Sequence, residues 1–200
     1  MHLCQRGGHR LFAAVYDRLT AQLEHEVLAP RRAALLGGLE GDVLEVGAGT
    51  GASLPHFRRA RRVVAAEPDP AMRRRMAAKV GQAFVPVELA AAVAEALPYR
   101  DASFDAVVFV GTLCTVADPD RALAEARRVL RPAGRLVALE HVRGDGRLAR
   151  WQDRVTPLWS RLMAGCHASR DTPAAIDRAG SPWRGSSAST RSHAGSRPGR

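Results

Sequence analysis

Ten residues decide the fold of this chain: Asp42-Val43-Leu44-Glu45-Val46-Gly47-Ala48-Gly49-Thr50-Gly51. The apolar residues before the first glycine are typical of a buried strand. Glycines at three alternate positions then predict a sharp turn that leads into a helix starting near Ala52. Because glycine has no side chain and tolerates positive φ, backbone amides in such a turn can approach a ligand closely. The stretch therefore predicts a nucleotide-cofactor site.

Two cofactor classes fit this glycine spacing. Gly47, Gly49 and Ala52 satisfy the dinucleotide fingerprint G-x-G-x-x-G/A, and Glu67 follows where that fingerprint places a ribose-binding carboxylate. Gly47, Gly49 and Gly51 equally satisfy the G-x-G-x-G turn of proteins that bind S-adenosylmethionine. The spacing alone leaves both cofactors open.

Length and composition predict one soluble globular domain. The 200 residues, 46% of them hydrophobic, are enough for a core that buries roughly 70% of the unfolded-chain surface. Three cysteines without a C-x-x-C pair, Cys4, Cys114 and Cys166, favour a reducing cytoplasm and argue against a disulfide framework or a zinc site. The N-terminus shows no signal peptide, and the longest apolar window, residues 106–117, is too short to span a bilayer.

Charge gives a weaker indication of partners. The formal net charge of +10 comes almost entirely from arginine, because Lys79 is the only lysine. This bias is compatible with nucleic-acid binding but does not indicate it. Peripheral contact with a membrane stays open, and the sequence does not define the oligomeric state.

Alternating strands and helices predict an α/β fold with a doubly wound, mostly parallel, Rossmann-like sheet. Predicted strands lie at residues 43–46, 63–67, within 85–91, 104–110 and 136–142. Predicted helices lie at residues 11–36 with an interruption at Pro30, 54–57, 69–81, 118–131, 147–164 and 172–179. The four arginines within residues 58–62 are expected to form a solvated turn. The ligand should lie at the carboxyl ends of the strands, where the strand order reverses beside the first strand.

Four motifs resemble class I S-adenosylmethionine-dependent methyltransferases of the small-molecule, type-11 group. They are residues 43–51, 94–98 (Ala-Glu-Ala-Leu-Pro), 103–108 (Ser-Phe-Asp-Ala-Val-Val) and 129–134 (Val-Leu-Arg-Pro-Ala-Gly), in the family's order across about half of the chain. The dinucleotide fingerprint accounts for the first motif only. The resemblance implies S-adenosylmethionine as the cofactor and a sheet order of 3-2-1-4-5.

Further motifs are similar to a subgroup related to phospholipid, thiol and quinone-precursor methyltransferases. They are residues 113–116, 140–142, 151–153, 157–159, 165–167 and 170–172. Only the prediction of the acceptor depends on this subgroup.

The resemblance also implies a cofactor site. Glu45 would be oriented toward the methionine amine, with a buried acid that caps nearby amides as the alternative. Glu67 would bind the ribose hydroxyls with both carboxylate oxygens, with a surface acid at a strand end as the alternative. The other implied cofactor contacts are Gly47, Ala48, Gly49, Gly51, Pro68, Ala94 and Glu95, the last two against the adenine, and Gly111 and Thr112 near the methionyl group or the substrate.

Two residues are candidate catalytic groups. Tyr16 lies in a segment similar to the family's cofactor lid, where an aromatic face would favour the sulfonium by a cation–π contact, and a packing tyrosine is the alternative. His141, at the end of the last predicted strand, is the best-placed general base, although a lone histidine is more often structural. Cys114 and Cys166 are expected to be small buried hydrophobes, and His167 lacks partners at metal-ligand spacing.

The predicted function is methyl transfer from S-adenosylmethionine to a small, apolar acceptor that offers a thiol, hydroxyl, amine or activated carbon. One domain should cover residues 1–180, with a helical lid at 11–36, a cofactor core at 42–142 and C-terminal helices at 147–179. Residues 181–200, rich in Ser, Arg and Gly, are expected to be a disordered tail in place of the family's last two strands. A cofactor-binding protein without activity is therefore the alternative function. A nucleic-acid methyltransferase and an NAD-dependent oxidoreductase are further alternatives, although Val110-Gly111-Thr112-Leu113 replaces the motif of amino-methylating nucleic-acid enzymes.

Overall fold

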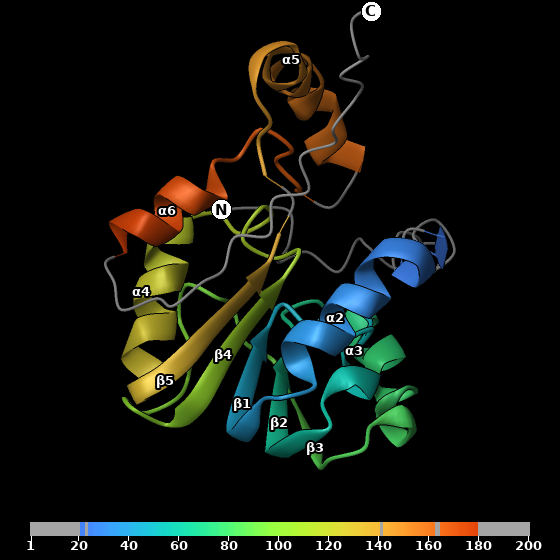
Figure 1. Cartoon of the computed structure of the whole chain (residues 1–200), viewed down its shortest axis with the longest axis vertical. Helices are drawn as coiled ribbons and strands as arrows, with labels where there is room; N and C mark the ends of the chain where they lie inside the picture. The colour runs from blue at the N-terminus through green and yellow to red at the C-terminus, as the bar shows by residue number, and fades with distance from the viewer. Residues whose placement is uncertain (1–20, 23, 141, 163–164, 180–200) are drawn as a thin grey trace, which may run out of the picture.

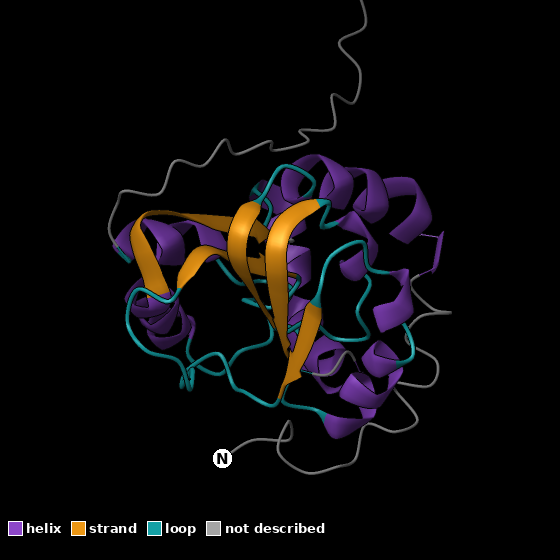
Figure 2. Ribbon diagram, turned by 90° about the horizontal axis from the view of Figure 1, so that it is seen from below, coloured by secondary structure: helices purple, strands orange, loops and turns teal. Residues whose placement is uncertain are grey.

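The computed structural model describes residues 21–22, 24–140, 142–162 and 165–179, and the fold is given for these. Five parallel strands form one sheet in the order β3-β2-β1-β4-β5 (Figure 1, Figure 2). The strands are β1 Glu40–Val46, β2 Arg59–Ala66, β3 Val87–Ala90, β4 Phe104–Val110 and β5 Leu130–Leu139. The predicted fold class and strand order are confirmed, and the order reverses between β1 and β4.

Helices cover both faces of this sheet (Figure 1). One face carries α4 (Pro119–Val129) and α6 (Thr172–Arg178), and the other carries α2 (Ala29–Leu36) and α3 (Pro70–Ala77). Side chains alternate along each strand, so Leu44 packs in the cluster that contains Leu123 of α4, whereas Val43 packs with Leu36 of α2. The remaining long helix, α5 (Gly146–Leu162), lies beyond the carboxyl end of β5 (Figure 1).

Two predicted helix starts are confirmed by their caps. The Asp69 carboxylate accepts hydrogen bonds from the amides of Ala71 and Met72 at 2.6 and 3.2 Å, and Asp118 accepts one from Arg121 at 3.0 Å. The predicted end of α3 at Gly81 is wrong, because α3 ends at Ala77. A tighter turn follows, in which the Lys79 amide donates to the Met76 carbonyl at 2.8 Å, and a 3-10 turn spans Val80–Gln82.

The helix predicted near Ala52 is also absent from the described fold. A single 3-10 turn, Leu54–His56, follows the glycines. Phe57 then has extended backbone angles, with φ −77° and ψ 109°, and its side chain is fully buried. Burial of this aromatic ring directs the chain into β2 before a helix can form.

The arginines at 58–62 do not form a solvated turn, because β2 begins at Arg59. Parallel pairing with β1 places Arg59 opposite Glu40 and Arg62 opposite Asp42. Arg59 forms an ion pair with Glu40 at 2.5 Å, and Asp42 binds both Arg61 and Arg62. Backbone pairing and these carboxylates therefore hold a highly charged segment in the sheet.

The last strand begins six residues earlier than predicted. Leu130, expected inside the preceding helix, pairs with Phe104 of β4, and the register then jumps so that Arg135 pairs with Ala106. Residues 131–134 bulge out between these pairs, which accommodates Pro132 and a positive φ of 64° at Ala133. Because β5 is the edge strand of the described sheet, the missing amide of proline interrupts no second ladder.

Parts of the predicted organisation lie outside the described residues. Within the predicted N-terminal helix, the structure describes a π-helical turn at Glu24–Leu28 and then α2, whose first turn contains Pro30. Residues 11–20 of that helix and the predicted tail at 181–200 are not described. The lid, the domain boundary and the disordered tail therefore stay predictions.

Candidate active site

The glycine turn after β1 is tied to the end of β2. The amides of Gly47 and Ala48 both donate to the Ala66 carbonyl, at 2.8 and 3.0 Å. These two bonds place the turn at the carboxyl edge of the sheet, between β1 and β2. The predicted ligand edge and the glycine turn thus coincide.

The three glycines are required for two different reasons. All three have positive φ, between 57° and 81°. A Cβ atom on Gly47 would lie 2.4 Å from Thr112 Cγ2, and one on Gly51 would lie 2.9 Å from Met76 Cγ, so these two glycines allow close packing inside the protein. A Cβ atom on Gly49 would meet nothing within 4 Å, and the same holds for Gly111, where φ is 63°. Gly49 and Gly111 therefore face space that a ligand can enter.

Glu67 is a buried acid joined to this turn. Its side chain follows β2 directly, and the residue is 8% exposed, so it is not a surface acid. One carboxylate oxygen accepts a hydrogen bond from the Gly49 amide at 2.9 Å, and the other accepts one from the Asp69 amide at 2.8 Å. Burial raises the pKa of Glu67, and the two amide hydrogen bonds partly offset this effect. Arg73 donates to the carbonyls of Glu67 and Pro68 at 2.5 and 2.7 Å, which fixes the backbone at both predicted positions.

Glu45 lies in the middle of the sheet and is only 2% exposed. Burial is the main cause that raises its pKa to about 7, and a hydrogen bond from Ser53 acts in the opposite direction. Its Oε2 atom has no hydrogen-bond partner among the described residues. A buried carboxylate with an unpaired oxygen is costly unless a donor arrives. Glu45 is therefore a buried acid with Ser53 as a neighbour and one oxygen without a donor, and its role toward the methionine amine stays a prediction.

A third glutamate, at the end of β5, shapes the loop after β4. Glu140 Oε1 accepts hydrogen bonds from the amides of Thr112 and Leu113, at 2.7 and 2.9 Å. The Thr112 hydroxyl donates to the Val46 carbonyl at 3.0 Å. Thr112 thus connects β1, β4 and β5, and its methyl group packs on Gly47. Glu140 was not among the predicted site residues, because the predicted strand 136–142 enclosed it, whereas β5 ends one residue before it.

The predicted adenine segment is anchored to α4. Ala94 is 7% exposed and belongs to the main hydrophobic core. Glu95 Oε1 accepts hydrogen bonds from the amides of Ala117 and Asp118 at 2.9 and 3.3 Å, and Arg121 donates to the Glu95 carbonyl. The Glu95 carboxylate therefore holds the start of α4, and contact of this segment with the adenine stays a prediction.

The loop after α5 packs against the loop after β4. Arg170 Nη1 donates to the carbonyls of Leu113 and Val116, at 2.7 and 2.6 Å, and the His167 amide donates to the Cys114 carbonyl at 2.9 Å. Cys114 is buried and its thiol hydrogen bonds with that of Cys166, which together with burial raises the pKa of Cys114. Cys166 is half-buried and accepts a hydrogen bond from the Trp159 indole at 3.4 Å. Sequence reasoning did not identify Arg170, whose partners lie more than fifty residues away in the chain.

Comparison with known proteins resolves the cofactor ambiguity. A model of a methyltransferase-domain family matches residues 44–138. Thiol S-methyltransferase TMT1A from Homo sapiens is 30% identical over 175 residues, which cover 84% of this chain and 71% of the relative. The chain belongs to the S-adenosylmethionine-dependent methyltransferases. Its methyl donor is accordingly S-adenosylmethionine, and its fold class follows that of the family.

Other relatives of this methyltransferase differ in their acceptors. Phosphatidylethanolamine N-methyltransferase from Cereibacter sphaeroides is 36% identical over 136 residues, 66% of each chain. The crystal structure of an S-adenosylmethionine-dependent methyltransferase from Thermotoga maritima superimposes with a TM-score of 0.66 and 25% identity, covering 89% of this chain and 81% of that one. The methyltransferase spans between 58% and 71% of the length of the curated thiol methyltransferases that it matches.

The described residues of the methyltransferase fit its cofactor. Glu45 offers an unpaired carboxylate oxygen suited to an ammonium group, and Glu67 lies beside Gly49, whose Cα faces open space. The two predicted catalytic residues, Tyr16 and His141, lie outside the described residues, so their roles stay predictions. Among the described residues, no cluster of three His, Cys, Asp or Glu could hold a metal ion. No helix in the described part of the methyltransferase has the length and apolarity needed to cross a bilayer.

Proposed function

We propose that this methyltransferase acts on a small apolar acceptor and that the acceptor is a thiol. The thiol S-methyltransferase relative supports this choice, because it matches most of the chain. In the proposed site, Glu67 binds the ribose hydroxyls and Glu45 binds the ammonium group. Gly47, Ala48, Gly49 and Gly51 surround the methionyl and ribose parts, Pro68, Ala94 and Glu95 lie along the adenosine, and Gly111 and Thr112 line the route to the acceptor.

One observation carries the thiol proposal: three of the glutamates near the carboxyl edge are committed to backbone amides, and Glu45 is assigned to the ammonium group of the cofactor. Glu67, Glu95 and Glu140 each accept two amide hydrogen bonds, at distances between 2.7 and 3.3 Å. A carboxylate held in this way is a poor general base, because protonation would break the bonds that position it. A thiol, with a pKa of about 8.5, ionises without such help, whereas hydroxyl and carbon acids need a base.

The chemistry then requires little beyond positioning. Bound S-adenosylmethionine would supply an electrophilic methyl group on its sulfonium. The acceptor thiolate would form the new bond to that carbon, and the electron pair of the broken bond would stay on the cofactor sulfur. The thiol proton leaves to solvent before the displacement. Holding the reactants in line can lower the barrier by about 7 to 11 kcal/mol. The Arg170 and Glu140 hydrogen bonds serve this purpose by fixing the loop 112–116 on which the acceptor would rest.

Binding and turnover measurements test the proposal separately. Calorimetry should show binding of S-adenosylmethionine and none of NAD. Mass spectrometry of reactions with an alkyl thiol, a phenol and a phosphatidylethanolamine should then show methylation of the thiol. When kcat/KM is measured against pH for a series of thiols, the midpoint of each profile should follow the pKa of the thiol used. Cofactor binding without turnover on any acceptor would support the inactive alternative, and absence of cofactor binding would refute the proposal.

The histidine prediction has its own discriminating test. A general base typically contributes about 10² to 10⁴ in rate. We expect His141→Gln to keep thiol methylation close to wild type. A loss of about 10²-fold or more would instead assign His141 as the base and favour a hydroxyl or carbon acceptor. We also propose that the protein works in the cytoplasm, because its three cysteines form no C-x-x-C pair or disulfide framework in the sequence.

A further inference from the structure

Helix α5 has little contact with the rest of the protein. It extends beyond the carboxyl end of the sheet and stands apart from the layered body (Figure 1). Of its side chains described at Gly146 to Ser160, only Ala149 and Thr156 are buried. These two lie seven residues apart and therefore on one side of the helix. Most of the helix surface is available to a partner.

The available surface has an apolar face. Leu148, Trp151, Leu158 and Trp159 are 55%, 60%, 64% and 41% exposed, and Val155 between them is half-buried. Leu148, Trp151, Val155 and Leu158 follow one another at intervals of three and four residues, which places them on one face of the helix, and Trp159 borders that face next to Leu158. The four exposed residues are the majority of the seven large hydrophobic side chains that are exposed in the described chain. Such a concentration marks an interaction site.

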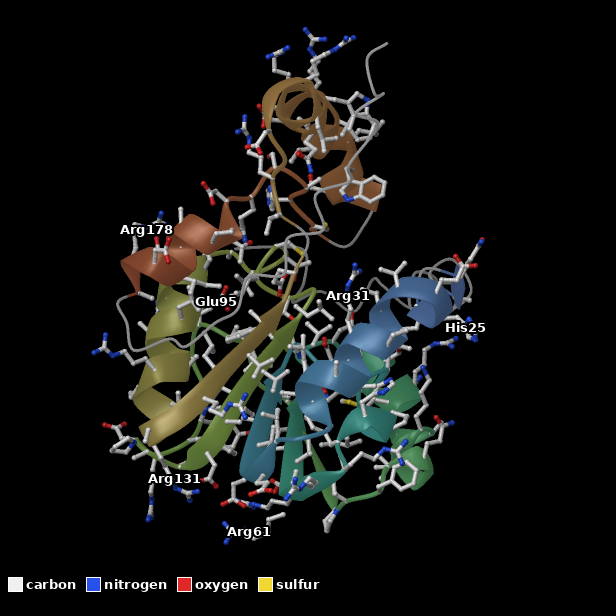
Figure 3. All side chains as sticks on the ribbon, in the orientation of Figure 1. His25, Arg31, Arg61, Glu95, Arg131 and Arg178 are labelled. Atoms are coloured by element: carbon white, nitrogen blue, oxygen red, sulfur yellow. The ribbon has the colours of Figure 1, made fainter. Side chains whose placement is uncertain are left out.

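Arginines run alongside this apolar face. Arg147, Arg150 and Arg154 are exposed, again at spacings of three and four residues, and none has a carboxylate partner in the described part of the chain. The helix has one acid, Asp153, whose carboxylate binds Arg143 at 2.7 and 3.1 Å. Figure 3 shows side chains projecting from α5 away from the sheet. The helix thus presents aromatic and aliphatic side chains next to uncompensated positive charge.

We propose that α5 docks on the surface of a bilayer that contains anionic phospholipids. Tryptophan and leucine side chains insert at the level of the headgroups, and the neighbouring arginines bind lipid phosphates. Charge complementarity selects this occupant, because a purely apolar partner would leave the three arginines without counter-charges. The combination of a tryptophan-containing apolar face and a basic flank is typical of helices that lie in the membrane interface.

Docking would also bring the active site to the membrane, an extension that rests on the proposed function. The Thr156 hydroxyl lies 3.2 Å from the Ser169 hydroxyl, and the Arg143 amide donates to the Arg170 carbonyl at 3.2 Å. Arg170 in turn holds the loop after β4. A bilayer beneath α5 would therefore lie close to the loops that line the proposed site. Apolar acceptors concentrate in such a bilayer.

Vesicle binding by the full chain tests the docking surface. We expect it to sediment with vesicles of phosphatidylcholine mixed with phosphatidylglycerol, and far less with phosphatidylcholine alone or at high salt. Each arginine near an anionic surface contributes about fivefold to partitioning, so replacing all three with glutamine should weaken binding by on the order of 100-fold. The pair Trp151→Ser and Leu158→Ser should weaken binding by at least about tenfold.

Matched controls exist on other elements. Arg74, Arg100 and Arg135 are exposed and remove the same charge when replaced with glutamine, and Phe84, 63% exposed, is the control for the apolar changes. These control variants should bind vesicles within about threefold of wild type, because charges far from the docked helix are largely screened by salt. Calorimetry with S-adenosylmethionine checks that every variant is folded, and vesicle binding stays interpretable whatever the acceptor proves to be.

Fluorescence of Trp151 provides an independent readout. In the double variant Trp159→Phe and Trp183→Phe, emission should shift to the blue on anionic vesicles and be quenched by brominated lipid. The proposal is overturned if vesicles do not bind or if the control variants lose as much binding as the α5 variants. It is equally overturned if Trp151 is shielded from iodide in the lipid-free monomer, which would indicate an internal cover, or if the α5 changes abolish self-association instead.

Discussion

Replacing Glu67 with glutamine is the sharpest test of the proposed ribose contact. Each oxygen of the carboxylate accepts one backbone amide, from Gly49 and from Asp69. Glutamine has one acceptor oxygen and one NH₂ group, so whichever way its amide turns, a donor faces a backbone donor. The substitution preserves shape while removing one hydrogen bond and the charge that would bind the ribose.

The expected losses follow from these two contributions. A buried amide left without an acceptor costs about 1 to 3 kcal/mol, so the free energy of unfolding of the ligand-free variant should fall by that amount in urea titrations. Hydrogen bonds to a charged group are worth about 1.5 to 3 kcal/mol, which corresponds to a Kd for S-adenosylmethionine that rises by about 10- to 100-fold in calorimetry.

Glu88→Gln is the matched control. Glu88 lies on neighbouring β3, its side chain is 61% exposed, and its ion pair with Arg62 is long at 3.6 Å, so we expect no change in either quantity. Unchanged cofactor affinity in Glu67→Gln, with or without lost stability, would refute the assignment of Glu67 to the ribose. Lost stability alone would leave Glu67 as an anchor of the turn.

Three further predictions concern the glycine turn after β1, the buried acid Glu45, and Arg170, which binds the loop after β4. Gly47→Ala should lower the free energy of unfolding by about 2 kcal/mol or more, because of strain at a φ of 72° and a 2.4 Å clash with Thr112. Gly49→Ala should lower it by only about 1 to 2 kcal/mol yet weaken cofactor binding. Urea titration measures the first effect and calorimetry the second. Because burial raises the pKa of Glu45 from 4.5 to about 7, the unfolded chain ionises first, so its contribution to ligand-free stability should decline as pH rises between those values. Unfolding measured across that range should show the decline, and Glu45→Gln should remove it; a profile unaffected by the substitution would contradict the reasoning. Arg170→Met should raise the acceptor KM more than it changes cofactor affinity, since both carbonyls that Arg170 binds lie in the loop after β4, and equal effects in steady-state kinetics and calorimetry would argue against that division.

The sequence by itself determined the alternation of strands and helices, the caps of α3 and α4 and the glycine turn after β1, whereas the strand order followed from the family resemblance. These features depend on local patterns: the buried run of β4, the Asp-Pro pairs at the helix starts and the glycines after β1. The periods of helix and strand and the chemistry of caps act over a few residues, so they can be read along the chain.

Only the tertiary structure decided which backbone groups the glutamates and Arg170 bind. Glu67 meets an amide 18 residues before it, Glu140 meets amides 27 and 28 residues before it, and Arg170 reaches carbonyls 54 and 57 residues away. The register of neighbouring strands creates the glutamate pairings, and packing of the loop between α5 and α6 creates that of Arg170. The charged start of β2 and the bulge around Pro132 belong to the sheet because of strand register. Local sequence carries the period of an element, whereas the partner of a side chain is set by which strands lie beside one another and at what offset.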